Sequence, residues 1–312
     1  MAGKYAEVMV TPRPVDPPRH AVRSAVALAL AEDLTPLGDL SASLVPPETR
    51  ATAVLASRAT GVFAGRACVD EAFAQVDDAV EVEWLVADGA DLAPGTVAAR
   101  VSGPLAPILT AERTALNFAR HLSGVATLTR RFVEAVGPDV LVWDTRKTIP
   151  GLRSLEKAAV RAGGGANHRG NLSDWVMLKD NHLAVLDVTT AVARAREVWP
   201  GRTIHVECDS VERAVAAAEA GADALLLDNL GPEDAAKAVL AAREALAGRR
   251  CLIEASGGIT LETVGSYAAT GVDAVSAGAL TDSAKALDLG LDVDMEGSAS
   301  CCWRWTRATP TP

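Results

Sequence analysis

Residues 203–228, TIHVECDSVERAVAAAEAGADALLLD, decide the fold of this chain. The segment begins with a short apolar run at 204–207 and ends with a second one at 224–227. Between them, residues 210–220 carry apolar side chains at the three- and four-residue spacing of an amphipathic helix. A strand, a helix and a second strand in this order predict a βαβ unit, in which the two strands are parallel.

Apolar runs of this kind recur along the whole segment after Gly137. Six of them have the length of strands and end in polar or glycine residues: 140–143, 175–178, 204–207, 224–227, 251–254 and 274–276. Helical patterns separate most of them, at 184–199, 210–220, 232–247 and 261–269. Apolar strands that alternate with helices predict a parallel sheet covered by helices, either a βα-barrel or an open doubly wound sheet. No Gly-x-Gly-x-x-Gly follows the first strand, so a dinucleotide-binding form has little support.

The chain before Gly137 has a different organisation. Short β-like runs at 53–56, 80–86 and 96–101, with a helical segment at 64–75, predict a small α+β domain with one open sheet. A long helix is expected over 111–135, with a break near Ser123 and Gly124. We therefore expect four parts: a flexible arm 1–18, an α+β domain 19–118, a barrel domain 119–290 and a disordered tail 291–312.

The charge of the chain is unevenly distributed. The net charge of −10 argues against a general nucleic-acid binder, because phosphate contacts need a basic surface. Residues 144–182, in contrast, hold seven Lys or Arg against four acidic residues, which suggests a small anionic ligand.

No apolar run approaches the ~20 residues that cross a bilayer, and residues 1–18 lack the pattern of a signal peptide, so we expect a cytoplasmic protein with no membrane partner. The cysteines have no zinc-ligand spacing and are expected to be core thiols.

Polar or glycine residues follow each of the six predicted strands, where a βα-barrel has its active site. A first group is cationic and suits carboxylates and phosphates: Arg146, Lys147, His168, Arg169 and Lys179. A second consists of carboxylates that suit sugar hydroxyls or a magnesium-bound phosphate: Glu207 and Asp228. A third suits a phosphate held by backbone N–H groups: Ser256, Gly257, Gly258 and Gly278. An anionic acceptor, a sugar and a phosphate in one pocket indicate phosphoribosyl transfer.

Several long motifs carry a resemblance to a known family. They are 112–117 (ERTALN), 144–153 (DTRKTIPGLR), 163–169 (GGGANHR) with 172–174 (LSD), 177–182 (MLKDNH) and 254–259 (EASGGI). With these motifs the chain resembles the quinolinate phosphoribosyltransferases over roughly residues 20–290. The resemblance implies an α/β fold with an N-terminal open-faced α+β sandwich domain and an incomplete α/β-barrel. It also implies a homodimer or higher oligomer with shared active sites.

The resemblance implies a reaction and a role for each matching residue. Quinolinate and 5-phosphoribosyl 1-pyrophosphate would give nicotinate mononucleotide, pyrophosphate and CO2, a step of NAD biosynthesis. The quinolinate carboxylates would be bound by Arg146, His168, Arg169, Lys179 and, from the partner subunit, the residue equivalent to Arg113. Lys147 would contact the donor, and Glu207 and Asp228 would hold the ribose hydroxyls directly or through Mg²⁺. The 5′-phosphate would lie on Ser256, Gly257, Gly258 and Gly278.

Two features depart from the family pattern. Asp282 stands where the family usually has histidine, so an anion replaces a cation near the phosphates. At ~4 Å and an effective dielectric constant of about 20, such a reversal matters by several kcal/mol. The tail 297–312, with Cys301 and Cys302, has no counterpart in the family. His205, within a predicted strand, is expected in the core.

Three other functions stay open at this point. Lys179 at a strand end also suits a Schiff-base lyase, although the surrounding cations favour a dianionic acceptor. The same fold and chemistry could serve a different aromatic acid, to which Asp282 alone points. A non-catalytic barrel that binds a phosphorylated ligand would be expected to lack Lys147, Glu207 or Asp228, and all three are present.

Overall fold

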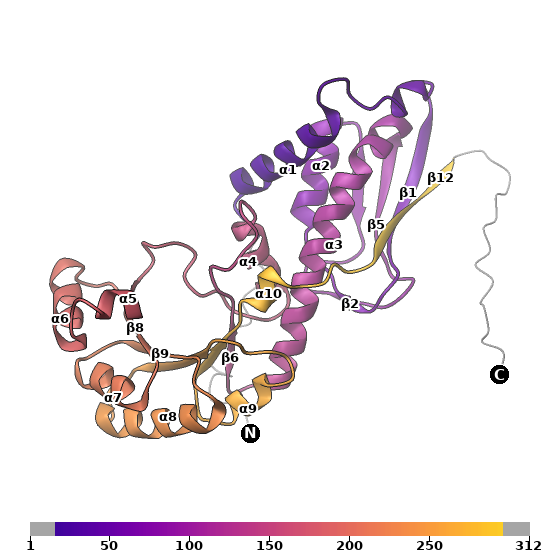
Figure 1. Ribbon diagram of the computed structural model, residues 1–312. Helices are drawn as coiled ribbons and strands as arrows, with labels where there is room; N and C mark the ends of the chain where they lie inside the picture. The colour runs from indigo at the N-terminus through magenta and orange to yellow at the C-terminus, as the bar shows by residue number, and fades with distance from the viewer. Residues whose placement is uncertain (1–15, 296–312) are drawn as a thin grey trace, which may run out of the picture.

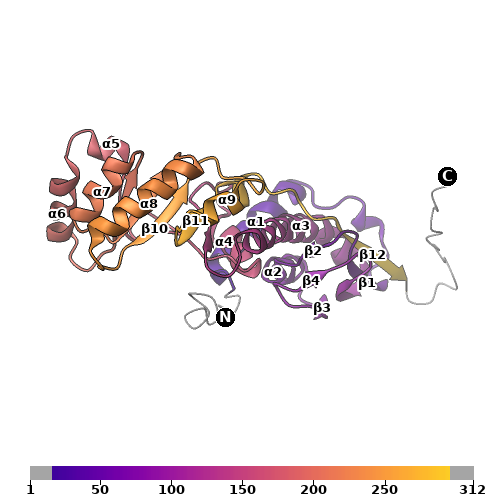
Figure 2. The same ribbon diagram turned by 90° about the horizontal axis from the view of Figure 1, so that it is seen from below.

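The computed structural model describes residues 16–295, which form two units linked by a long helix (Figure 1). The first unit is an antiparallel sheet in the order β12-β1-β5-β3, with helices on one of its faces (Figure 2). Its elements are α1 (Arg19–Leu34), η1 (Ala42–Leu44), β1 (Arg50–Ser57), β2 (Gly61–Val62), α2 (Arg66–Val76), β3 (Glu81–Trp84), β4 (Asp91–Leu92), β5 (Val97–Pro104), α3 (Leu105–Val136) and β12 (Leu289–Met295). This arrangement confirms the predicted open-faced α+β domain.

The second unit is a sheet of six parallel strands in the order β6-β11-β10-β9-β8-β7. Its strands are β6 (Leu141–Trp143), β7 (Val176–Leu178), β8 (Ile204–Cys208), β9 (Ala224–Asp228), β10 (Leu252–Ser256) and β11 (Ala274–Ser276). Its helices are α4 (Arg153–Ala162), α5 (Asp180–Leu183), α6 (Val188–Val198), α7 (Val211–Glu219), α8 (Pro232–Leu246), α9 (Val264–Ala268) and α10 (Ala279–Asp282). Because β6 and β7 lie at opposite ends of the strand order, the barrel is incomplete, as predicted.

The segment that begins with β8 shows why the sequence folds in this way. All five residues of β8 are buried, and they include the polar side chains of His205 and Glu207 beside the apolar ones. Helix α7 begins after Ser210, whose side chain accepts a hydrogen bond from the N–H of Arg213 (3.2 Å). The small buried face of α7 then lets the chain return to β9, which pairs in parallel with β8. The predicted βαβ unit is confirmed.

Helix α3 is continuous from Leu105 to Val136, so the predicted break near Ser123 and Gly124 is wrong. The Ser123 hydroxyl accepts a hydrogen bond from the N–H of Ala64 (3.0 Å) and donates one to its carbonyl (3.2 Å). A Cβ on Gly124 would come within 2.3 Å of the carbonyl oxygen of Lys285. Both small residues allow other segments to approach the helix closely, and neither interrupts it.

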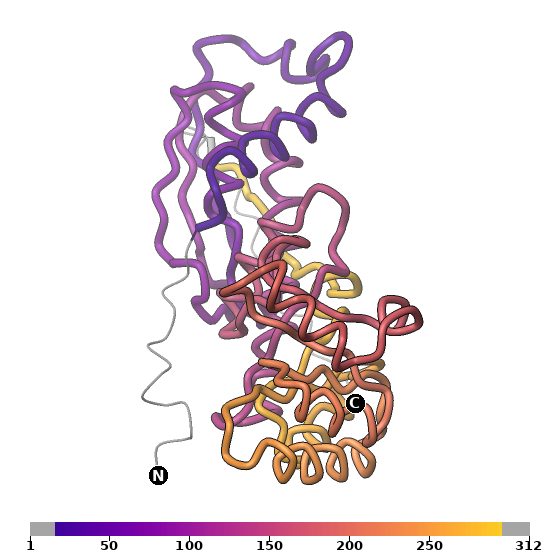
Figure 3. The backbone as a smooth tube through the Cα atoms, turned by 90° about the vertical axis from the view of Figure 1, so that its left-hand side faces the viewer, coloured from indigo at the N-terminus to yellow at the C-terminus, as the bar shows by residue number. Residues whose placement is uncertain are grey.

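Strand β12 corrects the prediction that a disordered tail begins at residue 291. Residues 289–295 pair antiparallel with β1, with Leu291 opposite Leu55. Leu289 is buried and Leu291 packs against the hydrophobic core, so the strand closes one edge of the first sheet. Figure 3 shows this segment, in yellow, running from the barrel back to the N-terminal unit. The expected arm at 1–15 and the tail residues from 296 on, Cys301 and Cys302 included, lie outside the described residues.

The cysteines within residues 16–295 are core thiols, as predicted. Cys68, Cys208 and Cys251 are buried and form no disulfide. Burial raises the pKa of the Cys68 and Cys208 thiols to about 12, which makes them poor nucleophiles. Within the same part of the chain, no helix combines the length and apolar character required to cross a bilayer.

Candidate active site

The carboxyl ends of the six parallel strands surround a cavity of about 580 Å³. Residues from all six strand ends line it, which is the expected position of an active site in this kind of fold. Eleven of the twelve residues predicted from the sequence lie in its lining: Arg146, Lys147, His168, Arg169, Lys179, Glu207, Asp228, Ser256, Gly257, Gly258 and Gly278. The twelfth, Arg113, is exposed on α3 and is not part of the lining formed by the described chain. The structure therefore brings the set together within one chain, with one exception.

A buried ion pair holds the loops that follow β6 and α4. Asp144 has no exposed surface and is paired with the ammonium group of Lys157. The same carboxylate accepts hydrogen bonds from the backbone N–H of His168 (2.9 Å) and the Asn167 amide (2.6 Å). Lys157 also donates to the carbonyl of His168 (3.0 Å). Burial raises the pKa of Asp144, while Lys157 and the hydrogen bonds oppose that shift.

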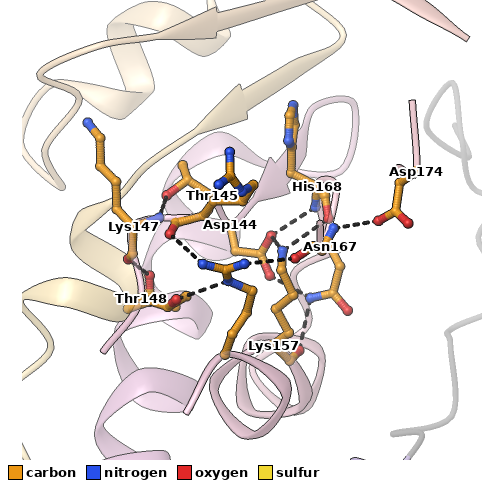
Figure 4. A network of polar contacts seen from close by, with 12 residues as sticks. Asp144, Thr145, Lys147, Thr148, Lys157, Asn167, His168 and Asp174 are labelled. Carbon is orange, nitrogen blue, oxygen red and sulfur yellow. Dashed lines mark hydrogen bonds and ion pairs between the residues drawn. The ribbon is translucent and has the colours of Figure 1, made fainter. Parts of the chain in front are cut away.

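This network places the cationic side chains of the cavity. Arg153 adds hydrogen bonds from its guanidinium group to the Thr148 hydroxyl (3.2 Å) and the Gly170 carbonyl (3.1 Å). In Figure 4 the side chains of Lys147 and His168 extend to one side, away from the helix that carries Lys157. The sequence interpretation assigned no role to Asp144, Lys157 or Arg153. A signal was present for two of them, because Asp144 and Arg153 lie within the motif 144–153, whereas Lys157 lies outside the quoted motifs.

The guanidinium groups of Arg146 and Arg169 both line the cavity. Burial, and then the nearby charge of Arg146, lowers the pKa of Arg169. The Nε atom of Arg146 is buried and has no hydrogen-bond partner among the described residues. Two guanidinium groups at one cavity, that of Arg146 with an unused buried donor, are suited to a multiply charged anion.

Lys179, Glu207 and Asp228 form a charged group on the adjacent strands. The ammonium group of Lys179, at the end of β7, forms an ion pair with Glu207 on β8. Burial, and then the charge of Glu207, raises the pKa of Asp228 on β9. The two carboxylates repel each other when both are ionised. Their oxygens can serve as ligands for a divalent cation or as acceptors for hydroxyl groups.

Glycine residues shape the opposite side of the cavity. Gly257 has φ +92°, and a Cβ there would lie 2.2 Å from the side-chain oxygen of Asn229. A Cβ on Gly278 would come within 2.7 Å of the Lys147 side chain and 3.3 Å of a carboxylate oxygen of Asp282. The exposed Asp282 thus borders the cavity near Lys147, at the position where the family resemblance leads us to expect a histidine.

His168 and Glu254 lie deeper in the cavity wall, next to His205. The Nε2 atom of His168 is 3.3 Å from a carboxylate oxygen of Glu254, and both residues are buried. His205 is buried, as predicted, and its ring stacks on Trp175 with a centroid distance of 4.6 Å. Burial lowers the pKa of His205 to about 4. The sequence interpretation did not single out Glu254 as a site residue.

Known proteins resemble this chain over nearly its whole length. Family models described as the N- and C-terminal domains of quinolinate phosphoribosyl transferase match residues 39–123 and 125–292. A probable nicotinate-nucleotide pyrophosphorylase [carboxylating] of Bacillus subtilis is 40% identical, over 85% of this chain and 92% of the relative. The nicotinate-nucleotide pyrophosphorylase [carboxylating] of Mycobacterium leprae is 41% identical, over 88% of this chain and 97% of the relative.

Solved structures agree with the sequence matches. The nicotinate-nucleotide pyrophosphorylase of Francisella tularensis superposes with a TM-score of 0.83 at 36% identity and covers 89% of this chain and 97% of its own. NadC from Streptococcus pyogenes gives a TM-score of 0.84 at 38% identity, with 90% and 99% covered. With both domains matched and the cavity in the expected place, the chain belongs to the quinolinate phosphoribosyl transferase family.

Proposed function

We propose that this protein transfers the phosphoribosyl group of 5-phosphoribosyl 1-pyrophosphate to quinolinate and releases CO2, giving nicotinate mononucleotide and pyrophosphate. The observation that carries the proposal is a single cavity with a cationic side, a carboxylate pair and a glycine-rich side. Family membership and the names of the relatives support the same reaction. NAD biosynthesis is then the process in which the product is used.

The acceptor is assigned to the cationic side of the cavity. Arg146 and Arg169 can each bind a carboxylate in a bidentate manner, and His168 and Lys179 border the same space. Quinolinate carries two carboxylates, which matches two guanidinium groups better than a singly charged acid does. Binding fixes the pyridine nitrogen toward the ribose, and orientation of this kind contributes up to about 7–11 kcal/mol.

The donor is assigned to the carboxylate pair and the glycine side. Glu207 and Asp228 accept hydrogen bonds from the ribose hydroxyls, and their charge stabilises the positive charge that develops at C1′. As the pyridine nitrogen bonds to C1′, the bond from C1′ to the pyrophosphate oxygen breaks and pyrophosphate takes its electron pair. Lys147 stabilises that leaving anion. Backbone N–H groups of 256–258 and Gly278 hold the 5′-phosphate.

Loss of CO2 follows from the charge on the new pyridinium ring. When the carbon–carbon bond to the carboxylate next to the ring nitrogen breaks, its electron pair remains on the ring carbon. The cationic nitrogen beside it stabilises that pair, and a proton from solvent then completes the product. The guanidinium groups keep the second carboxylate bound throughout.

We further propose that Mg²⁺ is the cofactor. Glu207 and Asp228 suit such an ion, since both line the cavity and offer the carboxylate oxygens that Mg²⁺ prefers. When bound, Mg²⁺ would neutralise negative charge on the pyrophosphate.

The decisive test is a product assay with purified protein, Mg²⁺ and 5-phosphoribosyl 1-pyrophosphate. We expect nicotinate mononucleotide and CO2 from quinolinate and no product from nicotinate. Product from another aromatic acid alone would favour the alternative acceptor to which Asp282 points. Borohydride trapping of Lys179 with a carbonyl substrate would favour the lyase.

A shared active site is the proposed reason why Arg113 lies outside the cavity of its own chain. In a dimer, the residue from the partner subunit would complete the acceptor side. The test mixes Arg113→Ala and Lys179→Ala proteins under conditions of subunit exchange, because hybrid dimers regain one intact site. Recovered activity supports the shared site, and no recovery after proven exchange contradicts it.

A further inference from the structure

Three buried side chains meet at the base of the cavity, on the acceptor side. His168 is in the loop after α4, His205 is on β8 and Glu254 is on β10, and they are 8%, 4% and 1% exposed. The Nε2 atom of His168 lies 3.3 Å from an oxygen of Glu254. One ligand atom from each of the three residues lies within 4.8 Å of the other two. The three residues come from separate segments, so only the fold brings them together.

The polar atoms of this group lack hydrogen-bond partners. Among the described residues, none is found for Nε2 of His168, Nδ1 of His205 or either carboxylate oxygen of Glu254. Nε2 of His168 and the nearest Glu254 oxygen are within ion-pair distance, but this contact lacks the geometry of a hydrogen bond. Buried polar groups in proteins are almost always hydrogen-bonded, and a buried carboxylate without a hydrogen bond is costly. A group of this kind therefore calls for a bound species that accepts electron pairs.

We propose that His168, His205 and Glu254 bind a divalent transition-metal ion of the zinc class. Two imidazole nitrogens and one carboxylate oxygen are a ligand set that zinc accepts, whereas Mg²⁺ prefers oxygen ligands alone. The ligands of a tetrahedral zinc ion lie about 3.4 Å apart, given bonds of about 2.0–2.2 Å. The pair His168 and Glu254 already has this separation.

The surroundings hold the two imidazole rings in place. The ring of His205 stacks on Trp175 at an interplanar angle of 11°. The ring of His168 meets the edges of Trp143 and Trp175, with centroid distances of 5.3 and 4.7 Å. Packing that fixes ring orientation lowers the entropic cost of metal binding and acts as an outer shell of the site.

The metal site has a consequence for the acceptor. His168 and Glu254 both line the cavity, so a bound ion would lie at the wall of the space assigned to the acid. A bound ion occupies the His168 nitrogen and competes with the acid for that position. This competition rests on the proposed function, whereas the metal binding itself does not.

The binding test uses the full-length protein after chelator treatment and dialysis, with excess Mg²⁺ present to saturate the oxygen-ligand site. Titration with Co²⁺, a spectroscopic substitute for Zn²⁺, is followed by visible absorption, and Zn²⁺ is then added to displace it. We expect one ion per chain with the strong absorption of a tetrahedral site. Glu254→Gln and His205→Phe should each weaken binding more than about tenfold. His205→Phe keeps a ring against Trp175, and circular dichroism verifies the fold of both variants.

Two controls separate this site from other metal-binding positions. His20→Gln removes an exposed histidine on α1 and should bind Co²⁺ as the wild type does. Asp228→Asn alters the proposed Mg²⁺ site and should leave the Co²⁺ spectrum unchanged. The proposal is overturned if the folded wild type shows no tetrahedral spectrum, or if Glu254→Gln and His205→Phe both bind with wild-type affinity. Product formation from quinolinate without Zn²⁺ reports on the proposed function separately, so the two can fail independently.

Discussion

The two sides of the cavity are built by different means. On the cationic side, the loops that carry Arg146 and His168 are held by buried charged side chains, above all Asp144 and Lys157. On the glycine side, the chain turns at glycines, and Gly257 leaves no room for a side-chain atom. The comparison shows that the cationic side depends on buried ion pairs, whereas the glycine side depends on residues that have no Cβ atom. A charge change should therefore damage one side and an added methyl group the other.

The strongest test of this difference is Lys157→Met. It leaves the Asp144 carboxylate buried without its ion-pair partner, and removal of one member of a buried pair costs about 3–5 kcal/mol. Urea unfolding measures the loss. The matched control is Lys237→Met, which breaks an exposed pair with Asp234 and should cost less than about 1 kcal/mol. Equal losses of unfolding free energy in both variants would contradict a larger contribution of the buried ion pair to stability.

Arg146→Ala should act on catalysis and leave folding almost unchanged. The guanidinium group is suited to binding a carboxylate of the acceptor, and loss of such a buried charged contact costs about 2–5 kcal/mol. The expected result is a corresponding decrease in kcat/KM for quinolinate, measured by product formation. Arg194→Ala, an exposed arginine on α6, is the control. A wild-type kcat/KM in folded Arg146→Ala protein would refute the assigned role.

Acid should destabilise the cationic side through His205. Its pKa is lowered to about 4 in the folded protein from an ordinary value of 6.5, so protonation favours the unfolded chain. Stability is therefore complete above about pH 6.5 and is lost as the pH falls toward 4, by roughly 3 kcal/mol in all. Unfolding free energies across this range, with chelator present, should fall more steeply for the wild type than for His205→Phe. Parallel curves would contradict the assignment.

Gly257→Ala tests the glycine side. The added Cβ meets Asn229 at 2.2 Å, and crowding of this kind costs about 1–3 kcal/mol beyond the strain of a positive φ. Gly95→Ala is a close control, because Gly95 has φ +89° and no atom within 4 Å of its Cβ position. The difference between the two variants in unfolding free energy isolates crowding. Equal unfolding free energies for the two variants would mean that the loop near Asn229 moves to accommodate the methyl group without loss of stability.

The smallest expected effect belongs to Asp282, at the border between the two sides. Asp282→His should tighten binding of 5-phosphoribosyl 1-pyrophosphate by about 1 kcal/mol, less than the several kcal/mol expected from the sequence, because the exposed side chain is screened by water. Calorimetry measures the affinity, and Asp282→Asn separates removal of the anion from addition of a cation. Weaker binding by both variants would indicate that the carboxylate serves the donor in this protein.

Local patterns predicted much of the molecule, and non-local contacts account for what they missed. All six barrel strands were predicted, because each is an apolar run bounded by polar residues. Strand β12 was missed because 289–295 becomes a strand only through pairing with β1, far away in the chain. The predicted break in α3 was wrong because Gly124 is required by the close approach of the Lys285 backbone. That contact comes from a distant segment and cannot be seen in the sequence around Gly124. Residue motifs predicted most of the cavity lining, but neither the ion pair of Asp144 nor the position of Glu254 next to His168.

The sequence by itself determined the βα alternation, the kinds of side chain at the strand ends and the family. These depend on periodicity and on residue type, which are properties of short segments. Only the tertiary structure decided that Lys157 is buried against Asp144, that Lys179 pairs with Glu207 and that His168, His205 and Glu254 meet. Such pairings depend on distances between segments that are remote in the chain, and those distances are set when the whole barrel packs.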